Sequence, residues 1–175
     1  VKAEDGWYDV EVPRSWTRYE DCGDWDYSIY TNTQMPWQEG DNASVPQAPT
    51  NYNPVGFYRK EFTVNPSMLQ ENGRVLISFQ GGESAYYVYV NGHEVGYSED
   101  SYRPHEFDIT DYLNPQGEVN TLAVEVHKFC DGTWMEDQDM IYDGGIFRDV
   151  YLYSTPLVHI SGYRVITGLD ETCTN

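Results

Sequence analysis

Hydrophobic and polar residues alternate along most of this chain with a period of two residues. Short clusters of glycine, proline, asparagine and aspartate interrupt the alternation. A period of two places apolar side chains on one face of a β-strand, whereas the period of a helix is about 3.6 residues. The pattern predicts strands over residues 8–12, 56–64, 75–80, 85–90, 94–97, 105–108, 120–129, 146–153 and 160–166.

The Asn91-Gly92 pair predicts a tight hairpin between two of these strands. Both central residues of a type I′ turn need a positive φ, which Asn and Gly adopt more readily than other residues. Only two short helical turns are indicated, over residues 66–70 and 110–113. Many short strands with almost no helix predict an all-β fold, and we expect a jelly-roll β-sandwich.

Residues 25–53 break the alternation and contain Pro36, Pro46 and Pro49 among many polar residues. This composition predicts a long loop, and its aromatic residues, among them Trp25 and Trp37, favour an ordered one. Loops of this length in compact domains are usually functional or disordered. We expect the sandwich to span residues 1–167, with residues 168–175 forming a linker or the start of a next domain.

Charge narrows the range of partners. Lys and Arg total 10 and Asp and Glu total 29, which gives a formal net charge of −19. A nucleic-acid backbone or an anionic membrane surface needs a cationic protein face, so neither is an expected partner. No apolar run approaches the roughly 20 residues of a membrane-spanning helix, so membrane insertion is not expected either. The acidic residues are spread along the chain, which indicates a solvated surface and a neutral partner.

Cysteine spacing and histidine placement limit the possible chemistry. Cys22, Cys130 and Cys173 show no CxxC spacing, which does not favour a zinc site and allows at most one disulfide. The four histidines lie in predicted strands or hairpins without a Gly-x-Ser-x-Gly elbow, so a hydrolase triad has no support. His127 in particular alternates with valines and is expected to be a strand residue.

An acidic stretch is the main candidate for chemistry. Glu136, Asp137 and Asp139 precede Gly144-Gly145 and an apolar run. Carboxylates in such a cluster suit a solvated turn, a cation site or a clamp for sugar hydroxyls. A retaining glycosidase needs two carboxylates about 5 Å apart on opposite sides of the scissile bond. Acids from one short loop lie mostly on one side of a substrate, so the residues alone leave the three roles open.

Several motifs together carry a resemblance to a known family. They are I-Y-T-N at 29–32, V-Y-V-N-G-H-E-V-G-Y-S-E-D-S at 88–101, and E-D-Q-D-M with G-G-I-F-R-D-V in 136–150. Over residues 12–166 the chain resembles the N-terminal sugar-binding domain of glycoside hydrolase family 2, in its large bacterial β-galactosidase branch. The resemblance implies a galactose-binding-domain-like jelly roll and a part in the hydrolysis of terminal β-D-galactosides by a retaining enzyme.

The resemblance also implies site residues. Asn32 matches an amide that projects into the galactose pocket, and Asp139 matches a carboxylate that touches galactose hydroxyls and helps to hold a sodium ion. These residue types suit the roles, since an amide both donates and accepts hydrogen bonds and a carboxylate binds a hard cation. Glu99 and Asp131 match positions where some relatives bind a structural divalent cation, whose other ligands come from an upstream segment.

The catalytic residues are expected outside this chain. Family members carry two catalytic glutamates on a (β/α)8 barrel, which needs about 250 residues by itself. The resemblance therefore implies a supporting domain whose partners are a galactoside and the barrel and immunoglobulin-like domains of the same polypeptide, with a homo-oligomeric parent as a further expectation. A free-standing lectin-like module and a purely structural interface domain are the alternative functions. Cytoplasmic and cell-surface or secreted locations both stay open.

Overall fold

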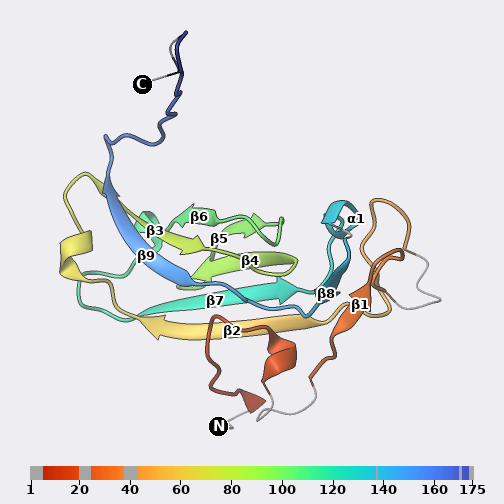
Figure 1. Cartoon of the computed structure of the whole chain (residues 1–175). Coiled ribbons are helices and arrows are strands. Elements are labelled where there is room, and N and C mark those ends of the chain that lie inside the picture. Colours follow the sequence, from red (N-terminus) through yellow and green to blue (C-terminus); the bar gives the residue numbers. More distant parts are fainter. Residues whose placement is uncertain (1–5, 20–24, 38–42, 137, 170, 174–175) are drawn as a thin grey trace.

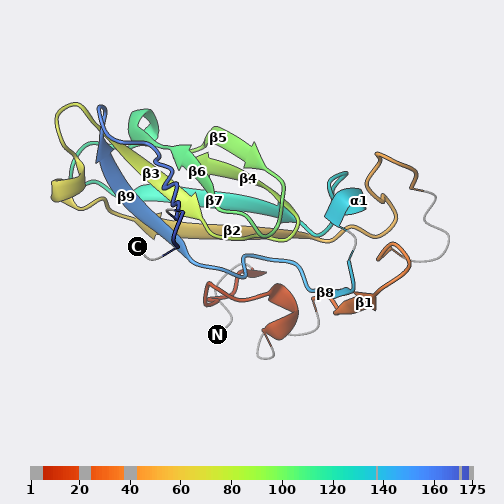
Figure 2. The same cartoon turned by 45° about the horizontal axis from the view of Figure 1, so that its top comes forward.

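Two antiparallel sheets pack face to face as a jelly-roll β-sandwich, as the alternation predicted (Figure 1). The computed structural model describes residues 6–19, 25–37, 43–136, 138–169 and 171–173. The larger sheet has the strand order β2-β7-β4-β5, and the smaller sheet has the order β6-β3-β9. Strands β1 and β8 form a separate two-stranded ribbon at the end of the sandwich where the short helix α1 lies (Figures 1 and 2).

The elements occupy the following residues: β1 Ile29–Thr31, β2 Val55–Phe62, β3 Gly73–Phe79, β4 Ala85–Val90, β5 His93–Ser98, β6 His105–Asp108, β7 Asn120–His127, α1 Thr133–Glu136, β8 Met140–Tyr142 and β9 Val150–Pro156. One-turn 3-10 helices cover Trp16–Arg18, Pro66–Met68 and Thr110–Tyr112. The last two confirm the predicted helical turns. The described residues contain no helix that is long and apolar enough to cross a membrane.

The core lies between the two sheets, where alternate residues of β3, β4 and β7 face inward. These side chains are almost fully buried: Val75, Ile77, Phe79, Tyr86, Val88, Val90, Val124 and Val126. Full burial of one such side chain stabilises the fold by roughly 1.5–3 kcal/mol. The predicted hairpin is also present, with positive φ angles of 51° at Asn91 and 82° at Gly92 between β4 and β5.

Two predicted strands are wrong. Residues 8–12 form no strand beyond a single bridge at Tyr8, because Tyr8 and Val10 pack against the core from an irregular segment. Residues 160–166 are extended and exposed, with Ile160 83 % and Ile166 80 % accessible, and no strand of the described chain pairs with them. In both segments the alternation shows where apolar side chains lie, but the segment does not form a β-strand.

The predicted loop over residues 25–53 is ordered where it is described, and it also contains a strand that the pattern missed. Residues 38–42 lie outside the described part of the chain. Strand β1 lies within this segment and pairs with β8. Each of these strands has three residues, which is too short for alternation to be recognised.

Candidate functional site

The β1–β8 ribbon brings together the two residues expected to contact sugar. Thr31 and Met140 are its last antiparallel pair. Asn32 follows β1 directly and Asp139 precedes β8 directly, so the next position on each strand belongs to these two residues. Both side chains are exposed. The ribbon thus presents an amide and a carboxylate side by side at one edge of the domain.

Tyr30 orients the carboxylate of Asp139. The phenol donates a hydrogen bond of 2.6 Å to Oδ1 of Asp139, and this bond to the carboxylate raises the pKa of Tyr30. Glu136, from the same acidic stretch, is engaged elsewhere: its two oxygens accept bonds of 2.7 Å from the backbone amide and the hydroxyl of Ser101. Glu136 therefore fixes a loop, whereas the side chain of Asp139 is exposed. Asp137 lies outside the described residues.

Asp143, which directly follows β8, ties the ribbon to the N-terminal segment. Its carboxylate accepts hydrogen bonds from Thr17 at 2.7 Å, from Ser28, and from Arg18 at 3.3 Å. Burial acts to raise the pKa of Asp143, but the bonds from Ser28, Thr17 and Arg18 outweigh it, so the pKa is lowered. The end of β8 and the entry to β1 are therefore held by one ionised side chain.

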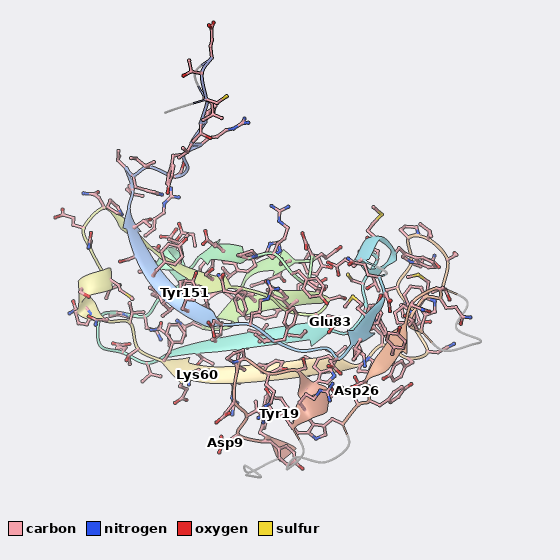
Figure 3. All side chains as sticks on the ribbon, in the orientation of Figure 1. Asp9, Tyr19, Asp26, Lys60, Glu83 and Tyr151 are labelled. Atoms are coloured by element: carbon pink, nitrogen blue, oxygen red, sulfur yellow. The ribbon has the colours of Figure 1, made fainter. Side chains whose placement is uncertain are left out.

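Glu83 also holds the turn at Asp143 and Gly144, although no sequence motif indicated this role. Its side chain is only 4 % exposed, and Oε2 accepts bonds from the backbone amides of Asp143 at 3.1 Å and Gly144 at 2.8 Å. Oε1 is buried with no hydrogen-bond partner among the described residues. Burial raises the pKa of Glu83 to about 7, against its two amide bonds and the nearby Lys128 charge. Figure 3 marks Glu83 and Asp26 at this end of the sandwich.

A buried ion pair between Lys128 and Asp26 holds the segment that leads into β1. Nζ of Lys128 lies 2.6 Å from Oδ2 of Asp26, and the two side chains are 0 % and 2 % exposed. Lys128 also donates to the carbonyl of Tyr27 at 2.7 Å, while Asp26 accepts from the indole of Trp16 at 2.7 Å and from the phenol of Tyr52. A buried charge is tolerated only when paired and hydrogen-bonded, and this pair meets both conditions.

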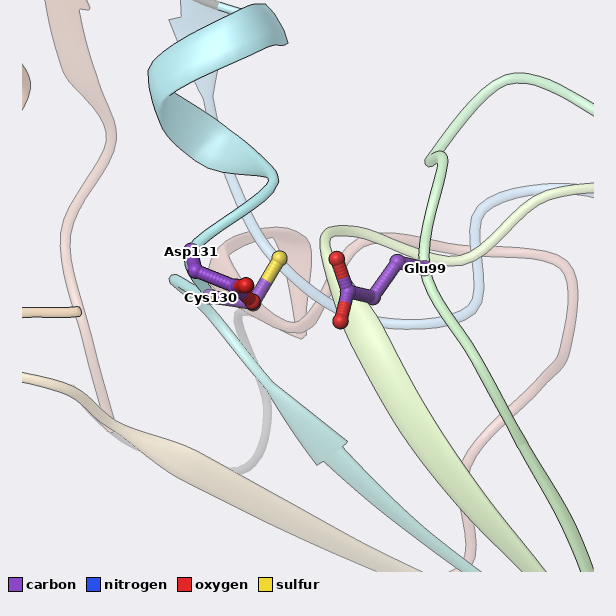
Figure 4. Close-up of side chains that lie close together, drawn as sticks. All are labelled: Glu99, Cys130 and Asp131. Atoms are coloured by element: carbon purple, nitrogen blue, oxygen red, sulfur yellow. The ribbon is translucent and has the colours of Figure 1, made fainter. Parts of the chain in front are cut away.

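A second cluster lies between β5 and α1. Glu99, which follows β5, meets Cys130 and Asp131, which lie between β7 and α1, and one ligand atom from each falls within 4.8 Å of the others (Figure 4). The structure thus brings together Glu99 and Asp131, the two residues expected to bind a divalent cation. The position of Cys130 in this cluster was not foreseen, because Glu99, which follows β5, is far from it in the sequence. Tyr97 donates a bond of 2.6 Å to Oε1 of Glu99.

Two other features lie apart from these clusters. His127 is a strand residue of β7, as expected, with its ring 3.0 Å from Oε1 of Glu125. A hollow of about 820 Å³ opens between the N-terminal segment and strands β2 and β9, and its lining includes neither Asn32 nor Asp139. The candidate sugar contacts therefore occupy an open edge of this domain and not an enclosed pocket.

Residues 3–156 match the description "Glycosyl hydrolases family 2, sugar binding domain". The chain belongs to this family. A beta-galactosidase of Priestia megaterium (strain DSM 319 / IMG 1521) is 52 % identical over 165 residues, covering 94 % of this chain and 15 % of that protein. A beta-galactosidase of Clostridium acetobutylicum is 48 % identical over 151 residues, covering 86 % of this chain and 16 % of that protein.

Solved structures agree on the fold of this family 2 domain. A beta-glucuronidase 2 of Bacteroides uniformis, covalently bound to a cyclophellitol-6-carboxylate aziridine, gives a TM-score of 0.53 at 28 % identity, over 60 % of this chain and 12 % of that chain. A beta-glucuronidase of glycoside hydrolase family 2 gives 0.55 at 21 % identity, over 88 % and 15 %. The chain spans about 15 % of the length of the curated relatives it matches, so it is one domain of a larger polypeptide.

Proposed function

We propose that this sugar-binding domain forms one wall of the galactose pocket in a retaining β-galactosidase. The observation that carries the proposal is the placement of Asn32 and Asp139 at adjoining positions of one ribbon. Both side chains are exposed, and an amide beside a carboxylate can bind several hydroxyls of one sugar ring. The names of the relatives at 52 % and 48 % identity support a galactoside as the substrate.

In this proposal the chemistry belongs to a barrel domain of the same polypeptide, and the present domain holds the sugar. Asp139 would also contribute an oxygen to a sodium ion shared with the barrel, a role that suits an exposed carboxylate. Positioning of this kind accelerates a reaction when it holds the reacting atoms in a productive geometry. Glu99 and Asp131 would hold a structural divalent cation, since their carboxylates converge.

Kinetics of the full-length enzyme test the sugar role. Asp139→Ala and Asn32→Ala should each raise KM and lower kcat on a chromogenic β-galactoside, with kcat/KM falling roughly 10- to 100-fold. Asp111→Ala removes an exposed carboxylate from a 3-10 turn and serves as the matched control. Unchanged kinetics for Asp139→Ala would remove the assignment. The 175-residue chain by itself should not hydrolyse the substrate, and turnover by it would refute a supporting role.

A lectin-like module would bind a glycan by stacking on exposed aromatic side chains; Trp25 is 44 % exposed, whereas Trp37 is half-buried among other aromatic rings. Trp25 contacts Tyr8 edge-on at 5.1 Å between ring centroids. Trp37 contacts Phe129 and Trp134 edge-on at 5.9 and 4.7 Å. Calorimetric titration of the chain with galactose separates the functions, because a lectin saturates whereas half of a pocket binds very weakly.

A further inference from the structure

The outer face of the larger sheet carries a row of aromatic side chains. Alternate residues of β4 and β7 enter the core, so the residues between them point away from it. Strand pairing sets four such residues opposite one another across β2, β7, β4 and β5 (Figure 1): Phe57, Glu125, Tyr87 and Tyr97. Phe57 is 63 % exposed and Tyr97 41 %, and the rings of Tyr87 and Tyr97 lie 4.6 Å apart between centroids.

A groove of about 410 Å³ lies on this face beside the aromatic row. The short side chain of Ala123 leaves space there, because its neighbours across the two adjoining strands are the larger Arg59 and Tyr89. Trp7 and Phe57 also line the groove. The ring of Trp7 is held over Arg59, with 5.0 Å between its centroid and the guanidinium carbon. The groove therefore has aromatic walls on both sides of a small residue.

A carboxylate lies among these rings. Glu125 pairs with both Phe57 and Tyr87, and its Oε1 lies 3.0 Å from Nε2 of His127. The Glu125 side chain is 30 % exposed, so its oxygens also reach solvent. The centre of a protein–protein interface is depleted in charged residues, whereas a carboxylate between aromatic rings can accept hydrogen bonds from hydroxyl groups. The face therefore fits a hydroxyl-rich ligand better than an apolar protein surface.

Charge and spacing narrow the class of ligand. The net charge of −19 disfavours an acidic glycan. Phe57 and Tyr87 lie two strands apart, which separates their backbones by roughly 10 Å, so one sugar ring does not stack on both side chains. A β-1,4-linked hexose chain is extended, and the apolar C–H faces of its successive rings suit a row of aromatic side chains.

We propose that the outer face of the larger sheet is a binding site for a neutral, β-1,4-linked hexose oligosaccharide. Phe57 and Tyr87 stack against sugar rings, and Glu125 accepts hydrogen bonds from their hydroxyls. The groove beside them, lined by neither Asn32 nor Asp139, receives a further part of the oligosaccharide. The proposal does not rest on the galactose role of those two residues.

The test uses the full-length protein and calorimetric titration with cellohexaose and with β-1,4-mannohexaose. Neither probe contains galactose, so the proposed galactose pocket does not account for binding. Wild-type protein should bind at least one probe saturably. Phe57→Ala should weaken that binding at least roughly tenfold, because it removes most of the apolar surface that a sugar ring covers there. Tyr151→Ala removes an exposed ring from β9, in the other sheet, and should bind as wild type does.

A second variant leaves every ring in place. Ala123→Leu fills the space between Arg59 and Tyr89, and it should also weaken binding at least roughly tenfold. Both substituted positions point away from the core, so the Tm of each variant should stay close to that of wild type. No saturable binding of either probe to wild type, or binding that both variants retain, would overturn the proposal. A changed oligomeric state of Phe57→Ala with unchanged glycan affinity would also overturn it, because the face would then be a protein interface.

Discussion

Tyr30 and Asp139 are joined by a hydrogen bond of 2.6 Å across 109 residues of sequence. Tyr30 pairs with Ile141 in the β1–β8 ribbon, and Asp139 lies two residues before Ile141, so its side chain falls on the same face. The phenol occupies Oδ1 and limits the rotation of the carboxylate. A residue proposed to contact sugar is therefore oriented by the strand that leads to Asn32, the second such residue.

Removing this phenol should weaken substrate binding. In the full-length enzyme, Tyr30→Phe should raise KM for a β-galactoside roughly two- to tenfold, because Asp139 loses the bond that orients it. Tyr151→Phe is the matched control, since its phenol is also exposed but lies on β9, away from the ribbon (Figure 3). Equal KM values for the two variants would contradict an orienting role for Tyr30.

The buried carboxyl of Glu83 should make stability depend on pH. Its pKa is raised from an ordinary value of 4.5 to about 7, so the folded chain binds the proton more tightly than the unfolded chain does. The stability contributed by this proton is fully present below pH 4.5 and is lost as the pH rises through about 7. The loss amounts to roughly 3 kcal/mol, since one pKa unit corresponds to about 1.4 kcal/mol.

Glu83→Gln should remove this dependence, because an amide carries no titrating proton. The free energies of unfolding of wild type and of Glu83→Gln are measured for the 175-residue chain in urea from pH 4.5 to 8. The value for Glu83→Gln minus the value for wild type should increase as the pH rises. Glu118→Gln, at an exposed position, should leave the wild-type profile unchanged. A constant difference between Glu83→Gln and wild type over this range would contradict the raised pKa.

The ion pair of Lys128 and Asp26 should be costly to break from one side. Lys128→Met leaves a buried carboxylate without its cation, which should lower the free energy of unfolding by about 3–5 kcal/mol in urea. The double variant Asp26→Asn/Lys128→Met should recover at least about 1 kcal/mol of this loss, because the unpaired charge is gone while an acceptor for Trp16 remains. Arg103→Met, which breaks an exposed pair with Asp100, should change stability by less than about 1 kcal/mol.

The sequence predicted those strands whose alternate residues enter the core. In β3, β4 and β7, apolar positions two residues apart are buried in the sandwich, so pattern and structure coincide. The same pattern over residues 160–166 failed, because alternation records apolar side chains and not a pairing partner. The three-residue strands β1 and β8 are held by Asp143 and Glu83, and such contacts between distant segments leave no local signal.

The candidate site could be predicted only through a family resemblance. Nothing local connects Asn32 with Asp139, and the acidic stretch by itself did not distinguish Glu136, which binds Ser101, from Asp139. Cysteine spacing did not indicate that Cys130 lies beside Glu99 and Asp131, because the fold brings these residues together. Lys128 lies between the end of β7 and Phe129, and a lysine in such apolar surroundings indicates a paired charge, because lysine is almost never fully buried without a partner.

Gly144 lies two residues after β8 and packs against the buried indole of Trp16, so there is no space for a side chain at this position of the turn. Its φ is +75°, and a Cβ atom there would lie 2.4 Å from Cζ2 of Trp16. Trp16 is 6 % exposed and its indole donates to Asp26, so the ring cannot move aside without breaking that bond. Gly117 offers a matched control, because its φ is +88° but no atom lies within 4 Å of its Cβ position.

Gly117→Ala should therefore lower the free energy of unfolding only by the strain of a positive φ, roughly 1–2 kcal/mol. Gly144→Ala should lose that amount and a further ~1–3 kcal/mol from overpacking against Trp16. Urea denaturation measures both losses, and near-ultraviolet circular dichroism reports displacement of the indole in Gly144→Ala alone. Equal losses in the two variants would mean that the turn relaxes without cost. In the full-length enzyme, Gly144→Ala should also raise KM, because displacing the turn after Tyr142 moves the strand that carries Asp139.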